Sequence, residues 1–191
     1  MTRTIITLAV ALVACLTTNR ALAQTNSKWT LYHSFSNITY IEPAGGTAFA
    51  IGYGGLFSYN SETGETAVYD KTNCLSDANI AHIAWSKSAK QLVIAYENSN
   101  IDLLTVNGNV TNVPDIYMKS TTLNKSINHI YIDGPYAYLS LGLGVGKLDV
   151  KRGIIVDTYQ LGFNVDYTYT KDGYIYAASS TNGLYRGKQT D

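Results

Sequence analysis

Four ring side chains occupy one position in four similar segments of the sequence. Tyr40, His82, His129 and Tyr167 each stand third in a run of four residues, at 38–41, 80–83, 127–130 and 165–168. A tyrosine ring stacks on apolar faces, and an imidazole donates hydrogen bonds in a pH-dependent way. If these segments are strands around one axis, this column of rings predicts a platform for a sugar or an anion. The alternative is that the rings pack between sheets with their polar tips satisfied.

The other candidate chemistry along the chain is weaker. A metal site is not expected at the column, because two histidines lack a third and fourth ligand and no acidic residue is in register. Glycosidase chemistry needs two acids across a cleft, and the available carboxylates are Asp102, Asp149, Glu62 and Glu65. Asp102 and Asp149 stand at related positions of two repeats, which favours a role in turn hydrogen bonds. With no G-x-S-x-G elbow present, we expect neither an enzyme nor a cofactor.

A glycine-rich stretch at 142–146 (GLGVG) superficially resembles a dinucleotide-binding loop. That motif needs a strand before it and a helix after it, so that phosphate meets the helix N-terminus. Strand-like residues flank this stretch on both sides. We therefore expect its glycines to permit close crossing of neighbouring strands.

The column belongs to a repeat of about 40 residues that holds four short β runs, which is typical of a β-propeller blade. The sequence predicts an all-β propeller with three four-stranded blades and three quarters of a fourth. Turns are predicted at Gly45-Gly46, Glu62-Thr-Gly64, Asn107-Gly108, Asp133-Gly134, Lys151-Arg-Gly153 and Asp172-Gly173. The predicted strands are 38–41, 48–51, 55–60 and 66–69; 80–83, 91–96, 100–104 and 109–113; 127–130, 136–140, 144–149 and 155–159; and 165–168, 174–178 and 182–185.

The composition supports a folded β protein and excludes some functions. Apolar residues make up 46% of the 191 residues, and the 16 Tyr and 16 Gly stand against only 3 Pro. Tyr favours strands and Gly favours turns. The 14 Lys and Arg balance 14 Asp and Glu, so there is no basic excess to neutralise phosphates, and a nucleic-acid partner is not expected.

The N-terminus is typical of an export signal. Arg3 precedes an apolar run over 5–14, and Ala21-Leu22-Ala23 has the form that signal peptidase cleaves. We expect a signal peptide at 1–23 and a mature propeller segment at 24–191, in the periplasm or at the outer membrane and cell surface. The run is too short for a transmembrane span. A lipoprotein processed at Cys15 is the alternative; after soluble processing only Cys74 remains, which allows no internal disulfide.

The predicted ring of blades does not close. Residues 29–32 (WTLY) stand before the first repeat as an outer strand would, and the fourth repeat stops after three strands. Closed propellers have about 4–8 blades. We expect an incomplete propeller that is the N-terminal piece of a longer protein, although a four-bladed ring completed by 29–32 is also conceivable.

One segment carries a family resemblance. Residues 72–80 (TNCLSDANI) resemble the NGLS-x-x-x-I turn of two-component-regulator propeller repeats, with Cys74 where Gly is usual. Together with 55–60, 98–104 and 155–162, it makes the mature chain resemble the N-terminal propeller of the PorZ family, from the type IX secretion system of Bacteroidetes. Members of that family have two large propellers and a C-terminal sorting domain, of which this chain has room for about half of the first propeller.

The resemblance implies a non-catalytic role at the outer membrane. PorZ-like proteins work with the sortase PorU and help to deliver anionic lipopolysaccharide to cargo proteins. The alternative is the periplasmic sensor propeller of a hybrid two-component histidine kinase, which has the same repeat. An enzyme such as a propeller lyase or glycosidase is the third possibility.

Overall fold

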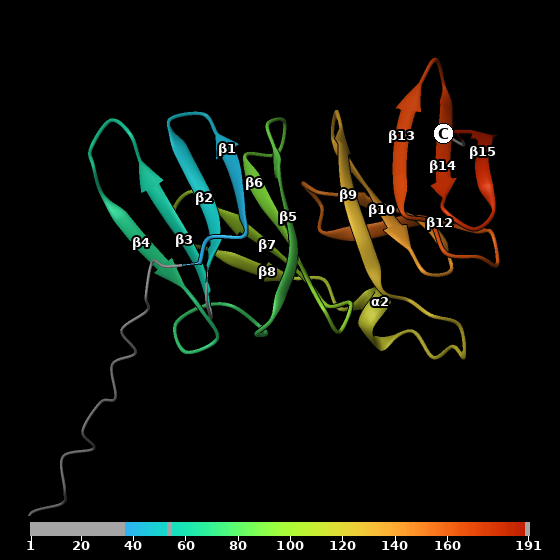
Figure 1. Cartoon of the computed structure of the whole chain (residues 1–191). Helices are drawn as coiled ribbons and strands as arrows, with labels where there is room; N and C mark the ends of the chain where they lie inside the picture. The colour runs from blue at the N-terminus through green and yellow to red at the C-terminus, as the bar shows by residue number, and fades with distance from the viewer. Residues whose placement is uncertain (1–36, 53–54, 190–191) are drawn as a thin grey trace, which may run out of the picture. The chain divides into compact units, whose positions relative to one another are not determined.

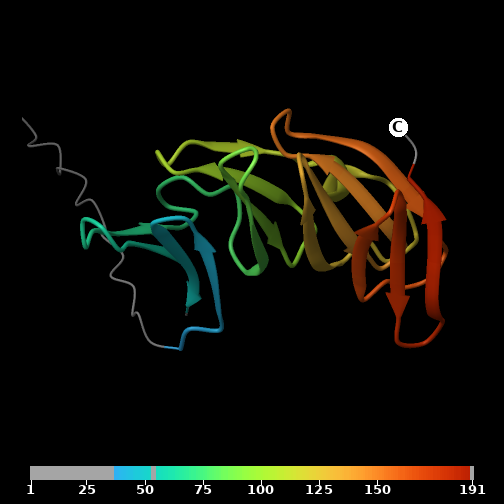
Figure 2. The same cartoon turned by 90° about the horizontal axis from the view of Figure 1, so that it is seen from above.

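The computed structural model describes residues 37–52 and 55–189. The predicted signal peptide, Cys15 and the predicted strand at 29–32 lie outside this part of the chain. The described residues form four antiparallel sheets, which follow one another in chain order (Figures 1 and 2). In each sheet the strands pair in the order in which they occur, so each sheet is a meander.

The sheets are the predicted blades. Blade 1 comprises β1 (Tyr40–Ala44), β2 (Thr47–Gly52), β3 (Gly55–Asn60) and β4 (Thr66–Tyr69). Blade 2 comprises β5 (Ile80–Ser86), β6 (Gln91–Tyr96), β7 (Ile101–Thr105) and β8 (Val110–Asn112), after which α2 (Asp115–Met118) makes one helical turn. Blade 3 comprises β9 (Ile127–Asp133), β10 (Tyr136–Leu141), β11 (Gly144–Asp149) and β12 (Ile154–Gln160). Blade 4 comprises β13 (Tyr167–Lys171), β14 (Tyr174–Ser179) and β15 (Gly183–Lys188).

The prediction of propeller blades, with three strands in the fourth, is therefore confirmed. The bounds of β3, β4, β6 and β11 are those predicted, and turn glycines such as Gly108 and Gly173 adopt the positive φ that a hairpin needs. The predicted starts of β1 and β13 are wrong by two residues. At β13 the reason is visible: the Asp166 side chain accepts hydrogen bonds from Asn164 and from the Ser180 amide, and so ties the chain into a loop before the strand begins.

The apolar core lies between the blades. Phe49 and Leu56 of blade 1 pack with Ile94 of blade 2, since residues on one face of each sheet meet the next sheet. The opposite face of blade 2, with Val93, packs against Leu139 of blade 3. A smaller cluster joins blades 3 and 4 and includes Tyr138, Val145, Ile175 and Ala177. Blades 1 and 4 lie at opposite ends of this row in both views, so the row is open (Figures 1 and 2).

Within the 142–146 stretch, Gly144 permits the close approach of two strands that was expected, Gly142 permits the approach of a loop, and Gly146 has only ordinary contacts. Gly144 opens β11 at a φ of +143°, and a Cβ there would lie 2.1 Å from the carbonyl oxygen of Tyr159 on β12. At Gly142 a Cβ would lie 2.7 Å from the Asn124 carbonyl oxygen. Both gaps are below van der Waals contact, so the backbones meet where side chains are excluded.

We expect Gly144→Ala to lower the free energy of unfolding by about 3 kcal/mol or more, because the added methyl group overlaps the Tyr159 carbonyl and the backbone is strained. Urea denaturation measures the loss. Gly173→Ala is the matched control, since its φ is +76° but nothing lies within 4 Å of the added Cβ, and it should lose only about 1 kcal/mol. Equal losses in the two variants would contradict the close approach.

Candidate functional site

The four predicted rings occupy equivalent positions on the first strand of each blade. The residues paired with them across the sheet all stand fifth in the second strand of their blade, and they are Ile51 for Tyr40, Ala95 for His82, Ser140 for His129 and Ala178 for Tyr167. The alignment of the repeats therefore predicted the register correctly. It is the blade-to-blade packing that decides which of the rings meet.

Two β-bulges set the direction of the histidines. On β5 the register shifts between Ile80 and His82, and on β9 it shifts between Ile127 and His129. Each strand thus has one extra residue, Ala81 or Asn128, directly before its histidine. A bulge bends the strand and re-aims the following side chain, and such bulges occur often beside binding sites.

The structure brings three of the four rings together. The His129 ring lies 5.1 Å from the Tyr167 ring, with an interplanar angle of 58°. His82 lies close enough to His129 for their charges to interact. Tyr40 stands apart: its hydroxyl donates to the Glu42 carboxylate at 3.3 Å, and no ring contact among the described residues joins it to His82.

A second row of rings extends this surface. Tyr131 and Tyr169 follow His129 and Tyr167 by two residues and therefore point to the same face of their strands. Their rings lie 5.2 Å apart, edge to face. Tyr167 and Tyr169 are both exposed. Tyr131 and Tyr169 were not among the predicted rings, although their two-residue spacing from His129 and Tyr167 was a sufficient signal for them.

The two histidines favour the neutral form. Burial lowers the pKa of His82, and the charge of His129 lowers it further. Burial also lowers the pKa of His129, whose Nδ1 is buried without a hydrogen-bond partner among the described residues. At neutral pH the pair is therefore uncharged and able to donate and accept hydrogen bonds.

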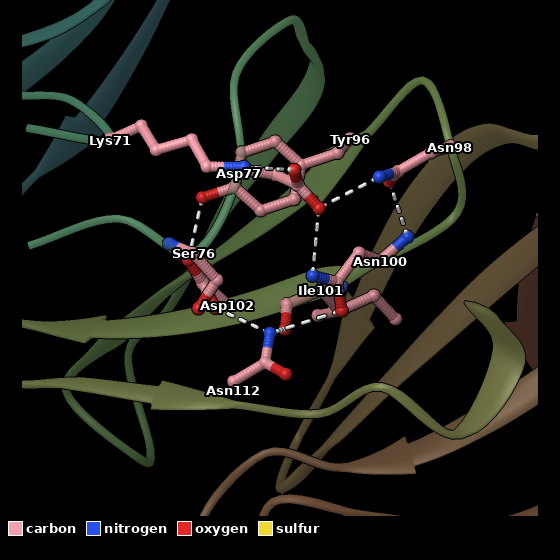
Figure 3. Close-up of polar contacts among 9 residues, drawn as sticks. All are labelled: Lys71, Ser76, Asp77, Tyr96, Asn98, Asn100, Ile101, Asp102 and Asn112. Atoms are coloured by element: carbon pink, nitrogen blue, oxygen red, sulfur yellow. Dashed lines mark hydrogen bonds and ion pairs between the residues drawn. The ribbon is translucent and has the colours of Figure 1, made fainter. Parts of the chain in front are cut away.

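A buried carboxylate network explains the motif at 72–80 (Figure 3). Asp102 on β7 is fully buried and accepts hydrogen bonds from the Tyr96 hydroxyl at 2.6 Å, the Ser76 amide at 2.7 Å and Asn112 at 2.8 Å. Its role is to fasten the loop between blades 1 and 2 to strands β6, β7 and β8 of blade 2. Burial, and then the hydrogen bond to Asp102, raise the pKa of the Tyr96 hydroxyl.

Asp77 completes this network at the surface. It accepts hydrogen bonds from Asn98 at 2.7 Å and Asn100 at 3.1 Å, and Lys71 lies 3.1 Å from its carboxylate (Figure 3). The Asn98 hydrogen bond, together with those from Asn100 and Lys71, lowers the pKa of Asp77. Asp77 of the motif and Asp102 of β7 thus hold the loop between blades 1 and 2.

The other candidate acids also serve turns. Asp149 accepts the Arg152 amide at 2.9 Å in the turn after β11. Glu65 accepts the Thr63 hydroxyl at 3.2 Å in the turn before β4. Cys74 beside this region is a free thiol whose pKa is raised by burial, then by Asp70 and Asp102, so it is protonated rather than a nucleophilic thiolate.

Within residues 37–52 and 55–189, no three side chains of His, Cys, Asp or Glu are grouped to hold a metal ion. None of the helices in the same ranges has the length and apolar character needed to cross a bilayer.

Four-stranded meanders packed face to face, with first strands that carry rings in register, define a β-propeller. The family model of the N-terminal β-propeller domain of PorZ, of the type IX secretion system, matches residues 48–191, so the chain belongs to this family. No curated protein matches the chain at a significant level.

Solved structures agree with the family. The chain is similar to PorZ of Porphyromonas gingivalis, described as an essential bacterial surface component of the type IX secretion system, with 32% identity and a TM-score of 0.77 over 85% of this chain and 22% of that one. The extracellular domain of BT4673 from B. thetaiotaomicron, a putative one-component system, has 17% identity and a TM-score of 0.64 over 83% and 22%. BamB from Moraxella catarrhalis has 19% identity and a TM-score of 0.61 over 82% and 48%. The chain thus spans about a fifth of PorZ, and the last two likenesses show the fold alone.

Asp102→Ala should lower the free energy of unfolding by about 3–5 kcal/mol, because it leaves the Tyr96 hydroxyl and the Ser76 amide without their acceptor. Chemical denaturation of the purified chain measures this. Asp149→Ala removes a single turn hydrogen bond and should lose only about 1 kcal/mol. A loss at Asp102 as small as that at Asp149 would show that the network does not fasten the loop.

The lowered histidine pKa values predict that stability falls in acid. Between the folded-state pKa and the unfolded-state value near 6.5, the unfolded chain binds more protons. The free energy of unfolding should therefore decrease as the pH falls from about 7.5 to about 5.5. The variant His82→Gln/His129→Gln should flatten this dependence, and an unchanged slope would contradict the assignment.

Proposed function

We propose that this chain is a non-catalytic binding segment of a PorZ-like protein of the type IX secretion system. The observation that carries the proposal is the match of residues 48–191 to the PorZ N-terminal propeller. We further propose that residues 1–23 direct export, with maturation before Gln24 and lipidation of Cys15 as the alternative. The segment then works in the periplasm or at the outer membrane and cell surface.

The proposed ligand is anionic lipopolysaccharide, in transit to cargo proteins with a PorU-like sortase as the protein partner. The proposed contact surface is the column Tyr40, His82, His129 and Tyr167, extended by the exposed Tyr169. What supports it is the chemistry of the site: exposed tyrosine rings offer flat apolar faces with polar edges, and the neighbouring imidazoles donate hydrogen bonds.

The absence of catalysis is part of the proposal. Its support is that the acids nearest to a catalytic role are engaged elsewhere. Asp102 accepts three hydrogen bonds inside blade 2, and Asp149 holds a turn. Neither is available as a general acid or base across a cleft.

The sensor propeller of a hybrid two-component kinase is the second candidate. Its support is the likeness to the extracellular domain of BT4673, a putative hybrid two-component system, at 15% identity. At this identity the likeness shows the fold alone, whereas the PorZ match shows the family. The PorZ-like role is therefore the first candidate. Sequencing of the gene downstream separates the two, since a second propeller belongs with PorZ and a transmembrane helix with a kinase belongs with the sensor.

We expect the chain to bind lipopolysaccharide with an anionic polysaccharide, and to bind it less after mild acid has removed the polysaccharide. Tyr167→Ala should weaken binding about 10-fold, because an exposed ring is lost from the platform. Isothermal titration calorimetry measures both affinities.

Tyr59→Ala is the control for the binding site, since Tyr59 is also an exposed tyrosine but lies on β3 of blade 1. It should leave the affinity unchanged. Equal weakening by the two variants would contradict the placement of the binding site at the column. If the wild-type chain binds neither the intact lipopolysaccharide nor the acid-treated form, the proposed ligand is wrong.

A further inference from the structure

A pocket lies between blades 1 and 2, beside their outer strands. Its wall on blade 1 is made by residues of β2, β3 and β4, and its wall on blade 2 includes Val106, directly after β7. The volume is about 360 Å³, within the range of about 300–1,000 Å³ that small-molecule sites have. Both walls belong to consecutive blades of the described chain, and none of the four rings of the column lines the pocket.

A short side chain on blade 1 leaves this space open. Ser58 pairs with the third residue of β2, and Leu103 pairs with the third residue of β6, so the two positions are equivalent. Between blades 2 and 3, Leu103 is 1% exposed, and the β11–β12 turn packs against it at Gly153. Between blades 1 and 2, the serine is too short to fill the corresponding space, and Val106 in the corresponding turn of blade 2 remains 53% exposed.

An aromatic ring and a pair of hydroxyls line the pocket together. The half-buried Tyr69 ring lies 6.3 Å from the Phe49 ring, which holds it from behind the pocket surface because Phe49 is buried. The Tyr69 hydroxyl lies 3.3 Å from Oγ of Ser58. This long contact is the one hydrogen bond that the buried Ser58 side chain makes among the described residues. A buried hydroxyl with a single weak hydrogen bond retains the capacity to bind a polar ligand.

Further polar groups surround this pair. Oδ1 of Asn60 already accepts two backbone amides of the β3–β4 turn, at 2.9 and 3.2 Å, so its side-chain nitrogen is the group left to donate to a ligand. Thr47 and Thr66 add hydroxyls, which both donate and accept. Glu65 is the one ionised side chain among the described residues that line the pocket.

We propose that this pocket binds a neutral hexopyranose residue. The apolar C–H face of such a ring fits on the Tyr69 ring, and its hydroxyls exchange hydrogen bonds with Ser58 and Asn60. An anionic ligand is disfavoured, since Glu65 repels it and the lining contains no lysine or arginine to pair with it. A cationic ligand gains little, because the exposed Glu65 carboxylate is screened by water. The site is independent of the anionic ligand proposed for the column.

Saturation-transfer difference NMR on the purified chain tests the proposal, with the methyl glycosides of glucose, galactose and mannose as probes. At least one should bind with a Kd on the order of 1 mM. The corresponding uronic acid, which carries a carboxylate on the same ring, should bind about 5-fold more weakly because of Glu65. The affinity of the neutral sugar should not change between about 50 and about 500 mM NaCl.

Two variants locate the site. Ser58→Leu introduces the side chain that blade 2 has at the equivalent position, so it should fill the pocket and weaken sugar binding at least about 10-fold without loss of stability in urea. Tyr69→Phe keeps the ring and removes one hydroxyl, and it should weaken binding about 5-fold. Ser120→Leu is the matched control, since Ser120 is exposed on the loop after α2, and it should bind as the wild type does.

Three results would overturn the proposal. The first is that none of the three glycosides binds. The second is that the uronic acid binds as tightly as the neutral sugar or that salt abolishes binding. The third is that Tyr69→Phe and a folded Ser58→Leu bind as well as Ser120→Leu, since the sugar would then bind elsewhere.

Discussion

The structure depends on one constraint: a four-stranded blade has two faces, and each apolar face must be covered by a neighbour. A sheet that buries only one face can leave the other polar, but blade 2 has apolar residues on both. Leu92 and Ile94 face blade 1, whereas Val93 and Ala95 face blade 3, and all four are completely buried. Burial contributes about 25 cal/mol for each Å² of apolar surface, so the blades are stable only in a row.

The loop between two blades adds a second requirement, which is that its buried backbone amides find hydrogen-bond acceptors. A chain that leaves one blade and enters the next exposes backbone amides at the crossing, and a buried amide without an acceptor is costly. Asp102 provides the acceptor for Ser76 while it also binds Tyr96 and Asn112 (Figure 3). Asp102 thus has a positional role in the fold.

Much of this could be predicted from the sequence because the repeat fixes the register. Once the first runs of the four repeats were aligned, the equivalence of Tyr40, His82, His129 and Tyr167 followed from their shared third position. The bulges at Ala81 and Asn128 could not be predicted, since neither position has a glycine or proline to indicate one. The separation of Tyr40 from the other rings depends on contacts between blades, which local sequence does not encode.

Each blade packs only against its neighbours in the chain, and this affects how the chain folds. Each blade is a local meander, and its long-range contacts involve the blade just before it. Such a quasi-one-dimensional array can order progressively from one end. A chain that crosses a membrane unfolded, N-terminus first, could add each blade to the last one as it emerges, and the most recently added blade would always be the one with an uncovered face.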